Sequence, residues 1–170
     1  MMHFPDFRSY ERAFQLITQV SGRAGRREKK GKVVLQTSDP NHLLFRYVIE
    51  NDVQGFLHDQ LADRQEHFYP PYTRLIEITI KHTDKKIAIE VAYKFARALK
   101  DELKNIRLLG PGEPMISKIR NEYLMAILVK INRDQGKLHE IKQTLSNTAT
   151  QLLQVKEYRS TKIVFDVDPA

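Results

Sequence analysis

The stretch that decides the fold of the second half of the chain is Leu75-Ile76-Glu77-Ile78-Thr79-Ile80-Lys81. Apolar side chains alternate here with side chains that tolerate water, which predicts a β-strand with one buried face. Asp84 follows as a helix N-cap, and apolar residues at helical spacing predict a helix that runs to Leu103. This strand and helix open a longer pattern.

Three further strands and one helix are expected after this pair. Residues 107–114 predict a short strand broken by a Gly/Pro turn, and residues 123–131 predict a longer strand. A helix that begins at Asn132 or Asp134 then leads to a last strand at residues 161–168. The order β-α-β-β-α-β is that of the α+β ferredoxin-like architecture, in which both helices cover one face of an antiparallel sheet. The other face, or a basic helix surface, would remain for a partner.

The first 69 residues predict an incomplete α/β unit. The expected elements are helices at residues 9–21, 39–48 and 51–68, with Ser9, Asp39 and Asn51 as N-caps, and a buried strand at residues 33–37. One strand cannot form a sheet by itself. We therefore interpret residues 1–69 as the C-terminal part of a larger lobe. Pro70-Pro71 ends the last of these helices and begins a second domain, residues 70–170.

Composition narrows the class of protein. The chain has 170 residues, a formal net charge of +7 and no cysteine, which excludes disulfides and thiolate metal sites within it. No apolar run approaches the ~20 residues of a membrane span, and the start lacks the features of a secretory signal. We expect a cytoplasmic protein with no membrane partner.

The positive charge is concentrated in the second part of the chain. Residues 1–70 carry 10 Lys and Arg against 9 Asp and Glu, whereas residues 71–170 carry 18 against 12. Such an excess favours a polyanion partner, because phosphate contacts release counterions. A basic surface that is merely solvated fits the charge equally well.

A Gly- and Arg-rich stretch, Gln19-Val20-Ser21-Gly22-Arg23-Ala24-Gly25-Arg26, follows the first expected helix. Gly22 and Gly25 are expected to end that helix and to expose the arginines. Planar guanidinium groups match phosphate oxygens, so Arg23 and Arg26 predict an anion clamp. No G-x-x-x-x-G-K-[ST] loop and no acidic Mg²⁺-binding motif occurs in the sequence, so the rest of a nucleotide site would come from elsewhere.

Other candidate sites are weaker. A stripe of cations on the helix after Asp84 is a candidate DNA or partner surface, although such a stripe is usually a solvated face: Lys94, Arg97, Lys100 and Lys104. The six histidines lack metal-ligand spacing, so no metal site is predicted. Asp166 and Asp168 would share one face of the last strand, where a structural role is expected.

Blocks of sequence along the whole chain resemble the C-terminal part of the bacterial primosomal replication-restart helicases, the PriA (primosomal protein N′) family. The pattern Q-x-x-G-R-x-G-R at residues 19–26 is the sixth motif of superfamily 2 helicases. The other matching blocks are Pro5-Asp6-Phe7-Arg8, Glu11-Arg12, Gln15-Leu16, Gly31-Lys32-Val33, Gln36-Thr37, Pro40, His42, Arg64, Pro70-Pro71, Leu109-Gly110-Pro111 and Asp166-Val167-Asp168-Pro169. The order and spacing of these blocks make the resemblance specific.

The resemblance implies part of an ATP-dependent 3′→5′ DNA helicase, a hydrolase that acts at stalled forks and assembles the primosome for DNA replication. Residues 1–69 would be the end of a RecA-like lobe. Arg23 and Arg26 would be catalytic, and Gln19, Gly22 and both arginines would bind nucleotide. The Walker motifs, the binding of ATP and Mg²⁺, and the zinc-binding cysteines would belong to upstream residues, so this piece alone is expected to be inactive. The partners implied are forked or single-stranded DNA, single-strand-binding protein and primosome proteins.

Two alternatives to a helicase fragment remain open at this point. Residues 70–170 could be a non-catalytic module that binds DNA or the acidic tail of single-strand-binding protein through its basic surface. The same residues could instead only buttress the helicase lobes.

Overall fold

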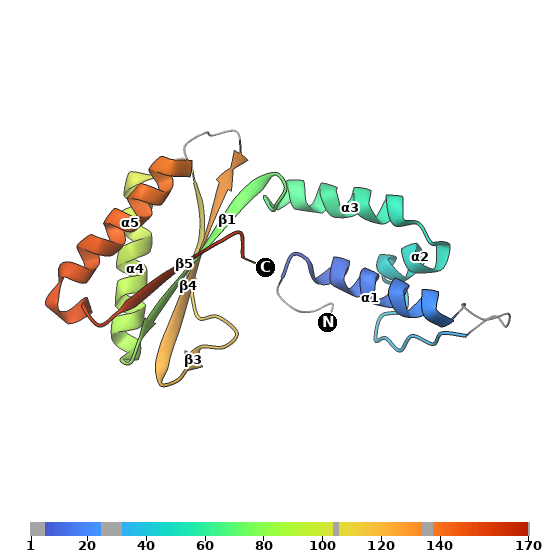
Figure 1. Cartoon of the computed structure of the whole chain (residues 1–170), viewed down its shortest axis with the longest axis horizontal. Coiled ribbons are helices and arrows are strands. Elements are labelled where there is room, and N and C mark those ends of the chain that lie inside the picture. Colours follow the sequence, from blue (N-terminus) through green and yellow to red (C-terminus); the bar gives the residue numbers. More distant parts are fainter. Residues whose placement is uncertain (1–5, 25–31, 104–105, 134–137, 170) are drawn as a thin grey trace. The chain divides into compact units, whose positions relative to one another are not determined.

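The structure is a computed structural model that describes residues 6–24, 32–103, 106–133 and 138–169. It consists of two compact units, Met1–His67 and Phe68–Ala170, and each unit is described by itself below (Figure 1).

The second unit is built on a five-stranded antiparallel sheet. Its strands are β1 (Thr73–His82), β2 (Arg107–Gly112), β3 (Lys118–Ile119), β4 (Glu122–Asn132) and β5 (Lys162–Val167). The strand order is β2-β4-β1-β5, and β3 pairs with the start of β4. Each crossover helix thus joins two strands that have a third strand between them, as in a split βαβ unit. The predicted β-α-β-β-α-β order is confirmed, with the short β3 added.

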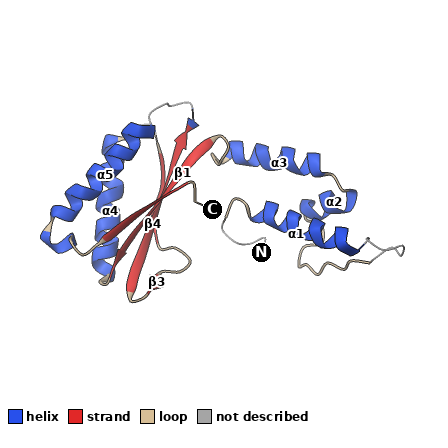
Figure 2. Ribbon diagram, in the orientation of Figure 1, coloured by secondary structure: helices blue, strands red, loops and turns tan. Residues whose placement is uncertain are grey.

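Two helices, α4 (Lys85–Glu102) and α5 (Leu138–Gln154), lie together on one side of this sheet (Figure 2). The predicted cap of α4 is confirmed, because the carboxylate of Asp84 accepts a hydrogen bond of 2.7 Å from the backbone N–H of Lys86. Asn132 ends β4 and does not begin α5, and Asp134 lies outside the described residues. A short 3₁₀ helix, η2 (Lys156–Tyr158), leads from α5 into β5.

The core of the second unit lies between the helices and the sheet. It takes alternate residues of the two central strands and the apolar stripe of α4: Ile76, Ile78, Ile80, Met125, Ile127, Val129, Ile131, Ala88, Val91, Ala92, Phe95, Ala96 and Leu99. Because side chains alternate across a strand, the residues between them lie on the face of the sheet that the helices do not cover.

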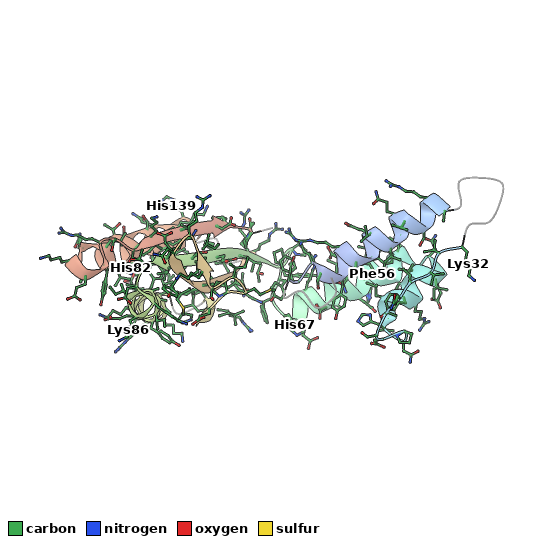
Figure 3. The ribbon with its side chains drawn as sticks, turned by 90° about the horizontal axis from the view of Figure 1, so that it is seen from below. Lys32, Phe56, His67, His82, Lys86 and His139 are labelled. Atoms are coloured by element: carbon green, nitrogen blue, oxygen red, sulfur yellow. The ribbon has the colours of Figure 1, made fainter. Side chains whose placement is uncertain are left out.

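The described residues of the first unit form three helices, α1 (Ser9–Ala24), α2 (Leu43–Glu50) and α3 (Val53–Glu66). Phe56 of α3, labelled in Figure 3, stacks on Phe14 of α1 with ring centroids 4.2 Å apart. Leu44 and Phe45 of α2 complete a small core with Ala13. This core is small for three helices. Several apolar side chains of the unit are exposed: Leu16, Val20, Val34, Leu35, Leu43, Ile49, Val53, Leu57 and Leu61.

The strand predicted at residues 33–37 is wrong. This segment has no regular secondary structure, and Val34 is 79% exposed. The apolar composition was correct for a strand, but a strand needs hydrogen bonds to a neighbour, and no other strand exists in the described part of the first unit.

Three predicted helix boundaries in the first unit are also corrected. Helix α1 continues to Ala24, so Gly22 lies within it instead of ending it. Helix α2 begins after His42, whose Nδ1 accepts from the N–H of Leu44, whereas Asp39 holds a turn before it. Helix α3 begins after Asp52, which caps Gly55, whereas Asn51 is a left-handed residue that ends α2. At the starts of α2 and α3, the side chain that caps the helix lies three residues and one residue, respectively, after the expected one.

Candidate nucleic-acid interface

Two cations lie side by side on the sheet face that the helices leave uncovered. Arg107 of β2 and Lys130 of β4 are direct register partners, so their side chains project to the same face. Lys130 alternates with Val129 and Ile131, which face the helices, and this places it on the opposite face. The topology therefore brings together two positive charges that are far apart in the sequence.

Each of these cations lies over one of two consecutive aromatic rings. The guanidinium carbon of Arg107 lies 3.4 Å from the centre of the Phe68 ring, and the amine of Lys130 lies 3.4 Å from the centre of the Tyr69 ring. The rings are attractive to cations because their faces carry partial negative charge. A hydrogen bond of 2.9 Å from the hydroxyl of Thr73 to the carbonyl of Phe68 helps to fix the turn that carries them. We call Phe68, Tyr69, Arg107 and Lys130 the cation–aromatic cluster.

The electrostatics of the cluster favour an anion. Burial and then the positive charge of Arg107 lower the pKa of Lys130, whose residue is only 6% exposed. Holding two like charges together costs free energy, and an oxyanion between or beside them would offset that cost. The matching ligands are phosphate and carboxylate groups. Leu109, exposed on the same face of β2, gives the site an apolar neighbour.

The predicted cationic stripe on α4 is only partly available to a ligand. The amine of Lys94 lies 2.8 Å from the carboxylate of Glu90 and also contacts the hydroxyl of Tyr158. These contacts raise the pKa of Lys94, so it stays charged but is engaged within the unit. Arg97 and Lys100 are exposed, and Lys104 lies outside the described residues. A DNA role for this stripe stays a prediction.

The predicted nucleotide residues lie on α1. Gln19, Gly22 and Arg23 are all exposed and follow the spacing i, i+3 and i+4, so they share one face of the helix. Gly25 and Arg26 lie outside the described residues. Their assignment to a nucleotide site stays a prediction.

A serine–histidine pair, Ser160 and His82, lies in the second unit and has a structural role. His82 Nε2 lies 2.8 Å from the hydroxyl of Ser160, and His82 Nδ1 accepts a hydrogen bond of 2.8 Å from the N–H of Asp84. Nδ1 also lies 3.2 Å from the carbonyl oxygen of Asp84, so both ring nitrogens of His82 have partners within the unit. The pair joins β1, which carries His82 (labelled in Figure 3), to the segment before β5.

Asp166 and Asp168 do not form an acid–base pair. Asp168 lies beyond β5 with a φ of 55°, and its carboxylate lies 3.4 Å from Arg74 and accepts from the N–H of Leu75 at 3.3 Å. It therefore anchors the end of the chain to β1. Within the described residues no group of three or more His, Asp or Glu side chains could hold a metal ion.

Comparison with known proteins decides the family. The family model described as the primosomal protein N C-terminal domain matches residues 65–170, which is more than half of the chain. The chain belongs to the PriA family. The prediction made from the sequence blocks is therefore confirmed, and residues 65–170 correspond to the C-terminal domain of that family.

Several PriA proteins match over most of the chain. The replication restart protein PriA of Bacillus subtilis is 34% identical over 169 residues, which is 99% of this chain and 20% of that protein. The PriA of Synechocystis is 37% identical over 132 residues, 76% of this chain and 16% of that protein. The PriA of Rickettsia conorii is 31% identical over 164 residues, which is 96% of this chain and 24% of that protein. The chain thus spans about a fifth of the length of these PriA relatives.

Among solved structures, an amidase of the hydantoinase/carbamoylase family from Burkholderia ambifaria aligns with 56% of this chain and 27% of its own, at a TM-score of 0.38 and 9% identity. Nothing about function follows from so low a likeness. No helix in the described part of the PriA-family chain is long and apolar enough to cross a membrane.

The cation–aromatic cluster was not predicted from the sequence. A detectable signal was present, because the aromatic pair Phe68-Tyr69 precedes the first strand and Lys130 interrupts an otherwise apolar run in β4. Only the register of β2 against β4 shows that these residues meet.

Proposed function

We propose that this chain is the C-terminal part of an ATP-dependent 3′→5′ DNA helicase of replication restart, and that its second unit binds the DNA backbone through the cation–aromatic cluster. Membership of the PriA family supports a role in replication restart and primosome assembly. The observation that carries the DNA role is the pairing of Arg107 with Lys130 on one face of the sheet. Arginine and lysine side chains commonly contact DNA phosphates, and the exposed Arg107 is the member of this pair that a phosphate reaches directly.

The first unit fits the end of a RecA-like lobe in this proposal. Its exposed apolar side chains and its lack of a sheet in the described residues support packing against further protein. Arg23 and Arg26 then reach the γ-phosphate of ATP and stabilise the charge that develops there, with Mg²⁺ and the remaining nucleotide contacts supplied by other residues of the helicase. The zinc site of the helicase also lies outside this chain, which has no cysteine.

The test compares two variants that each remove one arginine charge from the second unit. Binding of the 170-residue chain to forked DNA is measured by fluorescence anisotropy between about 50 and 200 mM salt. Arg107→Gln is expected to weaken binding and to reduce the slope of log K against log salt by about one phosphate contact. Arg159, an exposed residue after η2, is the matched control, and Arg159→Gln should leave the slope unchanged. Equal effects of the two variants, or binding that ignores salt, would contradict the proposed interface.

A second candidate ligand is the acidic tail of single-strand-binding protein. The exposed Leu109 beside Arg107 favours it, because a peptide with carboxylates and apolar side chains would use both. An acidic peptide that displaces forked DNA from wild type but not from Arg107→Gln would show that the two ligands share the cluster.

A further inference from the structure

A pocket of about 260 Å³ lies within the first unit. Its lining comes from all three helices and from the residue before α2, and its polar members are Tyr10, His42, Tyr47, Asp59, Gln60 and Asp63. Leu44 and Phe56, both nearly fully buried, add apolar surface. The pocket combines aromatic rings, carboxylates and an apolar base, although the chain as a whole is basic.

One side of the pocket is a pair of stacked rings. The rings of Tyr10 and His42 have centroids 5.1 Å apart and an interplanar angle of 23°. His42 is held in place because its Nδ1 accepts a hydrogen bond of 3.2 Å from the N–H of Leu44, the cap of α2. A flat, fixed aromatic surface of this kind suits a planar group that stacks on it.

Carboxylates supply the charge of the pocket. Asp59 and Asp63 are one helical turn apart on α3, so they lie on one face of that helix. The hydroxyl of Tyr47 donates a hydrogen bond to Asp59, and this bond lowers the pKa of the Asp59 carboxyl. Asp63 lies 3.4 Å from His67 Nδ1, and both carboxylates are about half exposed. Asp59 is therefore ionised at neutral pH, and the pocket repels phosphates.

We infer that this pocket binds the guanidinium group of an arginine side chain presented by a partner protein. A guanidinium is a planar cation that stacks on an aromatic face and donates in a fork to carboxylates, whereas an ammonium does only part of this. The methylene stem of the arginine packs on Leu44 and Phe56. The half-exposed carboxylates leave the pocket accessible to a side chain from outside the unit.

The probe for this inference is N-acetyl-arginine N-methylamide, added to the 170-residue chain and followed by NMR. The ring resonances of Tyr10 and His42 are expected to shift in a saturable way. Asp59→Asn removes the charge but keeps an oxygen for the Tyr47 hydroxyl, and it should weaken binding about threefold or more, the range of a partly exposed ion pair. Glu66, exposed on the same helix and outside the pocket, is the matched control, and Glu66→Gln should leave the affinity unchanged.

Three results would overturn the inference. The first is an equal loss of affinity in Asp59→Asn and Glu66→Gln, which would indicate attraction by general charge alone. The second is that adenosine monophosphate, or the lysine analogue of the probe, binds more tightly than the arginine probe, as measured from the same ring resonances. The third is failure of a longer PriA-family protein that contains this chain to bind the probe, since that would show the pocket to be covered within one polypeptide. Circular dichroism of each variant confirms that it has folded.

Discussion

The hydroxyl of Tyr158 donates a hydrogen bond of 2.6 Å to the carboxylate of Glu90, which lies 68 residues earlier in the chain. The amine of Lys94 joins both groups, at 2.8 Å from Glu90 and 4.9 Å from the centre of the Tyr158 ring. Since Tyr158 is buried, these contacts fasten η2 to α4. They also explain why a lysine predicted to face DNA is directed toward its own domain.

The first prediction concerns acid stability. Hydrogen bonds from Lys94 and then Tyr158 lower the pKa of Glu90 below its ordinary value of 4.5. A carboxyl whose pKa is lower in the folded state stabilises the fold above its ordinary pKa, and the contribution is lost as the pH falls through the folded value. Glu90→Gln should therefore destabilise the chain at pH 7, and its difference from wild type should shrink below about pH 4.5.

Urea unfolding at pH 7, 5 and 3.5 measures this difference. Glu102→Gln, which removes an exposed carboxylate near the end of the same helix, is the control and should show little effect at any pH. A difference between Glu90→Gln and wild type that stays constant with pH would contradict the prediction.

A second prediction compares two glycines of β2. Gly110 has a φ of +94°, and an added Cβ would lie 2.7 Å from the carbonyl oxygen of Ala126 on the neighbouring strand. Gly110→Ala is therefore expected to cost about 1–3 kcal/mol of unfolding free energy through backbone strain, with the clash in addition. An added Cβ at Gly112 would meet no atom within 4 Å, so Gly112→Ala should change stability by about 0.5 kcal/mol or less. Equal losses in chemical denaturation would contradict the described register.

The third prediction concerns Lys130 in alkali. Burial and the charge of Arg107 lower its pKa, so between the folded and the ordinary value of 10.5 the unfolded state binds more protons than the folded state. Stability due to this group must then rise with pH. From pH 7 to pH 10, the unfolding free energy of wild type should rise relative to that of Lys130→Met, and the variant should bind forked DNA more weakly at pH 7.

Lys142→Met is the control for Lys130→Met, because Lys142 is exposed on α5. Its difference from wild type should not change with pH. If the unfolding free energy of Lys130→Met instead rises relative to that of wild type as the pH rises, the charged form of Lys130 is not destabilised in the folded state.

A fourth prediction uses Gly22, which lies in α1 and would carry a Cβ without meeting any atom within 4 Å. Gly22→Ala should stabilise the 170-residue chain by up to about 1 kcal/mol, because alanine loses less conformational freedom in a helix. Thermal unfolding measures the gain. Destabilisation would show that Gly22 is not helical.

A fifth prediction tests the proposed nucleotide role of Arg23 and Arg26 in a longer PriA-family protein that carries the upstream lobes. Arg26→Ala should retain binding to forked DNA and lose DNA-stimulated ATPase activity by about a thousandfold or more, with Arg23→Ala affected in the same direction. Arg46→Ala, which removes an exposed arginine of α2, should leave turnover unchanged. Normal turnover in Arg26→Ala would remove its catalytic assignment.

Local sequence patterns predicted the structure correctly where it depends on residues that are close together in the sequence. The alternation at residues 75–81 predicted β1, Asp84 predicted the cap of α4, and the sequence blocks predicted the PriA family. The strand and the cap depend on residues that lie close together in the sequence, and the family depends on sequence similarity alone. The strand at residues 33–37 failed because its β-prone side chains needed a neighbouring strand that the described first unit does not contain.

The sequence by itself determined the order of the main elements of the second unit, their apolar faces and the family. Only the tertiary structure decided that Arg107 meets Lys130, that Lys94 is held by Tyr158, and that helices α1, α2 and α3 enclose an aromatic and acidic pocket. The physical reason is that periodicity fixes which face a residue occupies, whereas strand register and helix packing, set by contacts distant in the sequence, fix what lies opposite it.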